Sequence, residues 1–258
     1  MTLHNINDVY SEWFYITAGV RQGGILSPDF YSLYVDDLVL LLMRLNVGCY
    51  IRNVFVSALL YADDMALLSP SLRGLQQLLS ACEQFCKDWD ICLNPKKSQN
   101  MYFGKRQRNL CRLTLNGQGV EWAEKWPYLG IILQTGQTFN CCITEKIRKF
   151  YRACNGIFRI EGRSNDLMVL KLVESHCIPI LTYGIEVIFV ANSDTRRQLR
   201  VAYNSVFRRI CRYRPWQSVR ELQAFLKRPN WEVLVEKRCD NFHRRIRGDV
   251  VLSSVFPI

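Results

Sequence analysis

The chain has 258 residues, of which 49% are apolar and 22% are charged, and its net charge is +11. This apolar content supports a substantial core and excludes a disordered chain. Residues 1–100 include seven basic and ten acidic residues, whereas residues 101–258 include 27 basic and 13 acidic residues. The basic part predicts a polyanionic partner such as nucleic acid, although a solvated basic surface explains the charge equally well.

The cysteines and the apolar segments bear on location. Eleven cysteines and three histidines include no CxxC pair and no zinc-finger spacing, so a zinc site is not expected. This cysteine usage is typical of a reducing compartment, so we expect a nuclear or cytoplasmic protein. The first residues, MTLHNINDVYSEW, do not have the pattern of a secretory signal, and the longest apolar stretches are short or interrupted. We therefore expect neither secretion nor a membrane partner.

The first third of the chain predicts a strand, a helix and a hairpin. Residues 9–18 are rich in aromatic and β-branched residues, which favours a strand, and the glycines of residues 19–28 then predict a turn. Apolar residues three and four apart predict a helix from Asp29 to Leu45. Residues 54–60 and 65–68 predict two buried strands, which makes residues 61–64 the tip of a β-hairpin.

The rest of the chain changes from mixed to helical. Residues 69–71 are expected to cap a helix that runs to about Asp90. A turn over 93–98, a strand over 101–105 and short strands over 111–134 follow, with residues 128–133 as one β segment. From residue 137 the period is helical, with helices predicted over residues 143–157, 164–177 and 194–213. The sequence therefore predicts an α+β fold, divided into a mixed part (1–136) and a basic helical part (137–258).

Asp63 and Asp64 are the candidate catalytic pair. Adjacent carboxylates usually mark a polar turn, but strands on both sides would hold this pair rigidly, and nucleotidyl transfer depends on positioning. Ionised carboxylates are ligands for Mg²⁺, and two such ions can activate a hydroxyl and stabilise leaving pyrophosphate. Asp36 and Asp37 follow Tyr34 in a similar motif, but their helical spacing predicts solvated helix residues.

Several segments, in this order, resemble the reverse transcriptases of LINE-type (non-LTR) retrotransposons. They are GVRQGGILSPDFYSLYVDDL, LLYADDMALLSPSL, LNPKKSQNMYFG, YLGIIL, ITEKIRKFYRA and IPILTYGIEV. The resemblance implies a partial polymerase-type palm over residues 1–136, with an antiparallel sheet and helices on one face. A basic α-helical thumb would follow over residues 137–258.

The resemblance also implies roles at the hairpin and the glycine loop. Asp63 would be the principal metal ligand with Asp64 supporting it, for two Mg²⁺ ions or alternatively Mn²⁺, and Tyr61 would lie near the primer terminus. The template base and the incoming nucleotide would be positioned by Arg21, Gln22, Gly23 and Gly24. Two glycines before Ile-Leu-Ser-Pro are also typical of a tight turn without such a role.

Two further roles come from the later segments. Lys97 would protonate the departing pyrophosphate, with Lys96 as the alternative, although a Lys-Lys pair in a turn is usually only solvated. Tyr128, Leu129 and Gly130 would contact the primer backbone. The alternative for these three residues is a buried strand with a kink at Gly130.

The activity implied is an RNA-directed DNA polymerase that uses an RNA template, a DNA primer and deoxynucleoside triphosphates. The family takes a further catalytic aspartate from a block ahead of the glycine loop, and Asp8 is the only aspartate among the eighteen residues before Gly19. We therefore expect this polypeptide alone to be inactive. A non-catalytic nucleic-acid-binding remnant is an alternative, and a cyclase or other nucleotidyl transferase is disfavoured by the glycine loop and the basic helices.

Overall fold

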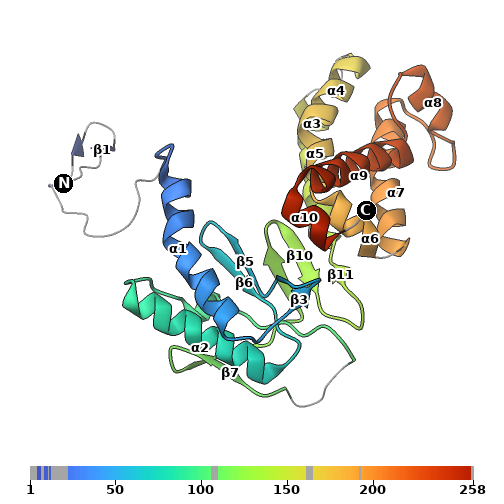
Figure 1. Ribbon diagram of the computed structural model, residues 1–258. Coiled ribbons are helices and arrows are strands. Elements are labelled where there is room, and N and C mark those ends of the chain that lie inside the picture. Colours follow the sequence, from blue (N-terminus) through green and yellow to red (C-terminus); the bar gives the residue numbers. More distant parts are fainter. Residues whose placement is uncertain are drawn as a thin grey trace. The chain divides into compact units, whose positions relative to one another are not determined.

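The computed structural model describes residues 5–6, 9–10, 12, 23–105, 110–160, 165–191 and 193–256 (Figure 1). The chain forms two compact units, and each is described by itself. The first unit comprises Met1–Pro95 and Leu113–Gly119, and the second comprises Lys96–Arg112 and Val120–Ile258. The division expected at residue 136, between a palm and a thumb, stays a prediction.

The first unit contains two long helices and several short antiparallel strand pairs. Its elements are β1 (Asn5–Ile6), β2 (Val9–Tyr10), α1 (Ser27–Arg44), β3 (Tyr50–Ile51), β4 (Val54–Phe55), β5 (Ala58–Tyr61), β6 (Asp64–Leu67), α2 (Leu72–Asp88) and β7 (Leu113–Leu115). Strand β7 pairs with β8 (Gln118–Val120).

The two helices form where the spacing of apolar residues predicts them. Pro28 lies in the first turn of α1, where its missing N–H costs no hydrogen bond. Helix α2 begins after Ser71, whose hydroxyl accepts a hydrogen bond from the backbone N–H of Gly74 at 3.1 Å. Both helices turn one face to a shared core of Leu38, Leu42, Leu78, Cys82, Phe85 and Cys86.

The β5–β6 hairpin packs one face on this core. Ala58, Met65 and Leu67 pack against it, whereas the side chain of Leu59 is 43% exposed. The expectation of two buried strands was therefore wrong, because two strands covered by helices on one side leave alternate residues open on the other. The strand predicted over residues 54–60 is also interrupted, since β4 ends at Phe55 and β5 begins at Ala58.

The second unit has a three-stranded antiparallel sheet, in the order β11-β10-β9, and a group of helices. The elements are the 3-10 helix η1 (Pro95–Lys97), β9 (Lys125–Tyr128), β10 (Ile131–Gln134), β11 (Asn140–Cys141), α3 (Thr144–Ile160), α4 (Asp166–Leu172), the π-helix η2 (Val173–Cys177), α5 (Ile178–Thr182), α6 (Ile185–Ala191), α7 (Ser193–Ile210), α8 (Arg220–Phe225), α9 (Trp231–Gly248) and α10 (Val250–Val255).

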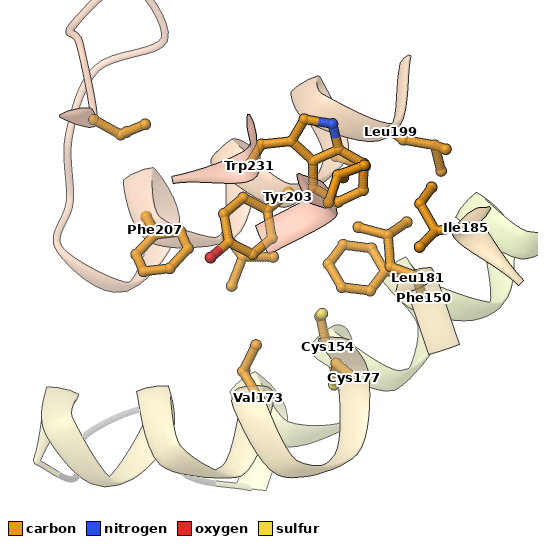
Figure 2. Packing of buried hydrophobic residues seen from close by; sticks show 14 of the residues in the cluster. Phe150, Cys154, Val173, Cys177, Leu181, Ile185, Leu199, Tyr203, Phe207 and Trp231 are labelled. Carbon is orange, nitrogen blue, oxygen red and sulfur yellow. The ribbon is translucent and has the colours of Figure 1, made fainter. Parts of the chain in front are cut away.

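One large core joins the helices of the second unit. Figure 2 shows Phe150 and Cys154 of α3 facing Cys177, Leu181 and residues of α7 and α9. Phe150, Cys177 and Leu181 are fully buried. Tyr203 is buried with them, and its hydroxyl donates a hydrogen bond to the carbonyl of Pro229 at 2.8 Å. Since this core takes residues from most of the helices, it fixes them as one body.

Two strands expected in this unit have a different form. The segment 128–133 is not one strand but a hairpin, because β9 ends at Tyr128 and β10 begins at Ile131. Residues 101–105 form no strand either. The preceding residue, Asn100, exchanges backbone hydrogen bonds of 2.8 Å with Glu121 and Ala123, and the N–H of Gly104 donates to the carbonyl of Gly136 at 2.9 Å.

The coarse predictions are otherwise confirmed. The fold is α+β, and helices occupy the predicted segments, with residues 173–177 as a π-helix at the end of the one predicted over 164–177. Of the strand expected over residues 9–18, Val9 and Tyr10 are paired with β1, and residues 11 and 13–18 lie outside the described residues. Among the helices of the described ranges, none is long and apolar enough to cross a membrane.

Cys82 makes the stability of the first unit sensitive to alkaline pH. Burial, with a contribution from Cys86, raises the pKa of the Cys82 thiol from 9.0 to about 12. The unfolded thiol ionises first, so stability that is complete below pH 9 is lost as the pH rises. We expect Cys82→Ala to flatten the decline in unfolding free energy between pH 9 and 10.5 by up to about 1.4 kcal/mol per pH unit.

Urea denaturation followed by circular dichroism at a series of pH values measures this slope. Below pH 8 the two proteins should show parallel pH dependence, whatever their difference in stability. Equal slopes above pH 9 would contradict the assignment.

Candidate active site

The tip of the β5–β6 hairpin presents the paired carboxylates. Tyr61 pairs with Asp64, so Ala62 and Asp63 are the two central residues of the turn. Ala62 has a φ of 49°, a left-handed conformation that suits two-residue hairpin turns but costs energy in a residue with a Cβ. The side chains of Tyr61, Asp63 and Asp64 are exposed. Asp63 therefore lies in a hairpin turn rather than on a helix, as predicted.

Helix α1 lies beside this tip. Burial raises the pKa of Tyr31 above its usual value of 10.0, and the negative charge of Asp63 raises it further. Tyr31 lies one turn into α1. Helix α1 and the hairpin also share a core, because Ala58, Met65 and Leu67 of the hairpin pack against a cluster that includes Leu38 and Leu42 of α1.

The glycine loop leads directly into α1. Gly23 has a φ of 77°, and the N–H of Ser27 donates to the carbonyl of Gly24 at 3.2 Å. The left-handed Gly23 is consistent with a tight turn, and a contact of this loop with a nucleotide stays a prediction. Arg21 and Gln22, predicted to act with it, lie outside the described residues.

Asp36 and Asp37 provide an internal comparison. They lie within α1, and both side chains are exposed. The prediction that this second Tyr-x-Asp-Asp sequence is helical is confirmed. One short motif therefore occurs in two backbone settings, and only the pair at 63–64 lies at a hairpin tip.

The chemistry of Asp63 and Asp64 suits a hard divalent cation. Both are carboxylates on adjacent residues, and their exposure leaves the oxygens accessible. Within the described ranges, no group of three or more His, Cys, Asp and Glu side chains gathers that could hold a metal ion by itself. The pair thus fits part of a ligand set, to be completed by other groups or by water.

The remaining predicted residues belong to the second unit. Lys97 ends η1 and is exposed, as is Lys96. Between β9 and β10, Leu129 (φ 45°) and Gly130 (φ 76°) form a turn with two consecutive left-handed residues, which is typical of a type I′ hairpin. Tyr128 and Leu129 are half-buried, and Gly130 is exposed.

The sequence reasoning missed two residues that interact with these candidates. The charge of Asp63 contributes to the raised pKa of Tyr31, and the hydroxyl of Tyr183 donates a hydrogen bond of 2.8 Å to the carbonyl of Leu129. Tyr183 is 54 residues away in sequence, so no local pattern links it to the turn. The only available signal was that Tyr183-Gly184 lies in a segment that resembles a family block.

Comparison with known proteins gives a consistent family. Residues 1–133 match the family model described as reverse transcriptase (RNA-dependent DNA polymerase). The chain is 28% identical over 223 residues (83% of its length) to the RNA-directed DNA polymerase from mobile element jockey of Drosophila melanogaster. It is 26% identical over 241 residues (90% of its length) to the jockey polymerase of Drosophila funebris.

A third relative is the probable RNA-directed DNA polymerase from transposon BS of Drosophila melanogaster, 30% identical over 218 residues, or 80% of this chain. The aligned parts cover 24%, 26% and 23% of these three relatives. The chain therefore spans about a quarter of the length of the curated relatives it matches.

The backbone at Ala62 gives a test of the hairpin tip. Ala62→Gly relieves a left-handed conformation that costs an L-residue about 1–2 kcal/mol, so the unfolding free energy should stay level or rise. The matched control is Ala66→Gly, within β6, which should lower the unfolding free energy by about 0.5–1 kcal/mol. Chemical denaturation compares the two variants, and equal destabilisation by both would rule out a left-handed residue at 62.

Proposed function

Because the chain belongs to the reverse transcriptase (RNA-dependent DNA polymerase) family, in its non-LTR retrotransposon branch, we propose that it supplies the catalytic hairpin and the primer-contacting turn of an RNA-directed DNA polymerase. The observation that carries the proposal is the pair Asp63 and Asp64 at a two-residue turn. Its substrates would be an RNA template, a DNA primer and deoxynucleoside triphosphates.

Asp63 and Asp64 would hold Mg²⁺, with Mn²⁺ as the alternative. When bound, a pair of such ions lowers the pKa of the primer hydroxyl and neutralises charge on the leaving pyrophosphate. The role of the protein is positional: the hairpin keeps both carboxylates exposed at a turn that is anchored on the core between α1 and α2. Because the hairpin fixes the backbone of both residues, metal binding would require little rearrangement of the main chain.

The other candidates act on the substrates. Gly23 and Gly24, with Arg21 and Gln22, would position the template base and the incoming nucleotide, since residues without side chains let the backbone approach closely. Tyr61 is exposed beside the aspartates and would lie near the primer terminus. Lys97 would donate a proton to the departing pyrophosphate.

The organisation proposed is a palm over residues 1–136 and a thumb over 137–258, with Tyr128, Leu129 and Gly130 against the primer backbone. The charge supports a nucleic-acid partner, because residues 196–247 contain fifteen Lys and Arg but four Asp and Glu. Arg197 of α7 and Arg244 and Arg245 of α9 are exposed. Binding through such a surface should weaken steeply with salt.

A direct test uses the two Tyr-x-Asp-Asp sequences as a matched pair. Millimolar Mn²⁺ should broaden the amide NMR signals of residues 61–65 through paramagnetic relaxation. Asp63→Ala should remove this broadening, because one of two adjacent oxygen ligands is lost. Asp36→Ala removes another exposed carboxylate, from α1, and should leave the broadening unchanged.

The response to Mn²⁺ and the nucleic-acid affinity together separate the proposal from a binding protein without catalytic function. Asp63→Ala should leave the affinity for a primer–template duplex within about twofold of the wild type, since Asp63 contributes no positive charge. Wild-type protein whose 61–65 signals do not respond to Mn²⁺, but which binds the duplex, would favour the non-catalytic alternative.

The inactivity of the polypeptide alone is a separate prediction. Two-metal chemistry needs more ligands than Asp63 and Asp64, and the described residues offer no larger group. We expect the 258-residue polypeptide, without other chains, to extend no primer with either Mg²⁺ or Mn²⁺. Sustained incorporation of deoxynucleotides in a primer-extension assay that Asp63→Ala abolishes would show this expectation to be wrong.

A further inference from the structure

The turn between β9 and β10 is held from outside the sheet by Tyr183. The Tyr183 hydroxyl donates to the Leu129 carbonyl at 2.8 Å. The ring covers the next residue, because a Cβ added at Gly130 would lie 3.0 Å from Cε1 of Tyr183. One side chain thus contacts both left-handed residues of the turn by two different interactions.

Tyr183 is itself held in place by Lys146 of α3. The Lys146 ammonium donates to the carbonyl of Tyr183 at 2.8 Å and to that of Ile180 at 3.3 Å. The same nitrogen lies 5.4 Å from the centroid of the Tyr183 ring, within the range of a cation–π interaction. Lys146 therefore ties the end of α5 to the first turn of α3.

The neighbouring residue reinforces this arrangement. Gly184 has a φ of 62°, and a Cβ there would lie 2.7 Å from Cδ1 of Ile131, the first residue of β10. The Tyr183-Gly184 pair is therefore packed along the turn and the strand that leaves it. A larger residue at 184 would be strained by its backbone and would press on Ile131.

Support of the fold alone does not fully explain the contacts of Tyr183 with the turn. The side chain of Tyr183 is 54% exposed, so burial of its ring contributes modestly to the core. Gly130 is also exposed, which leaves the braced backbone of the turn open to a ligand. The arrangement fixes a solvent-facing backbone segment in one conformation, as a site that contacts a strand of nucleic acid requires.

We propose that Tyr183, supported by Lys146, is a positioning residue that holds the Leu129–Gly130 turn in the conformation that contacts the primer strand. The inference rests on the proposed function, because it takes this turn as the primer-contacting site. It extends that function by joining α3 and α5, in the same compact unit, to the placement of the primer.

The test uses the 258-residue chain and Tyr183→Phe, which keeps the ring and removes only the hydroxyl. The matched control is Tyr34→Phe, because the Tyr34 hydroxyl also donates to a distant backbone carbonyl, that of Trp89, at 2.7 Å. The probe is a DNA primer annealed to an RNA template with a recessed primer end, compared with a blunt duplex of the same length. Hydroxyl-radical footprinting on the primer strand and fluorescence anisotropy give the readouts.

We expect Tyr183→Phe to weaken binding of the recessed primer–template by roughly fivefold, the ratio that corresponds to one hydrogen bond of about 1 kcal/mol. Affinity for the blunt duplex should change by less than about twofold, because the basic helices that attract it are untouched. Footprint protection should be lost only at the nucleotides nearest the primer end. Gly130→Ala should give the same pattern, and adding Tyr183→Phe to it should weaken binding little further.

Several results would overturn the inference. Equal losses for the recessed and blunt duplexes would show a general structural role, as would a fall in the thermal midpoint of Tyr183→Phe well beyond that of Tyr34→Phe. An unchanged footprint would show that the hydroxyl has no positional role. Wild-type protein that protects no primer-end nucleotides would instead overturn the proposed function, and the inference with it.

Discussion

The candidate site depends on a two-residue turn that presents two acidic residues adjacent in the chain. Ala62 adopts a left-handed conformation so that Tyr61 can pair with Asp64, and this leaves Asp63 at the apex and Asp64 at the start of β6. Both side chains are exposed, so a divalent cation can take oxygen ligands from each. Ala58, Met65 and Leu67 anchor the hairpin on the core formed by α1 and α2.

Each compact unit contains a two-residue turn at a candidate site, and the two turns are held in place by different interactions. In the first, the turn at Ala62 is flanked by strands that pack on a core formed by α1 and α2. The charge of Asp63 contributes to the raised pKa of Tyr31 in α1. In the second, the turn at Leu129 and Gly130 is held by a hydrogen bond from Tyr183. Each turn contains a non-glycine residue in a left-handed conformation, Ala62 or Leu129, which persists only because its surroundings determine it. Two of the nine described non-glycine residues with a positive φ, Ala62 and Leu129, thus lie at the positions proposed to meet metal and primer.

Much of this architecture could be predicted from local patterns, for physical reasons that particular residues make clear. The period of α1 and the N-cap at Ser71 are local signals, and they predicted α1 and α2. Burial depends on partners that are distant in sequence, which is why β5 and β6 were expected to be buried on both faces. The hydrogen bond from Tyr183 to Leu129 joins residues 54 positions apart, so the local spacing of residue types does not predict it. Asp63 and Asp64 could be chosen over Asp36 and Asp37 because helical and hairpin contexts differ in their apolar period.

The most direct measurement is a crystal structure of the chain grown with Mn²⁺ and recorded at a wavelength that gives an anomalous signal from manganese. The account predicts an anomalous peak in direct contact with carboxylate oxygens of both Asp63 and Asp64, with the turn at Ala62 still left-handed. A structure whose manganese peaks lie only at other carboxylates, such as Asp36 and Asp37, would contradict it.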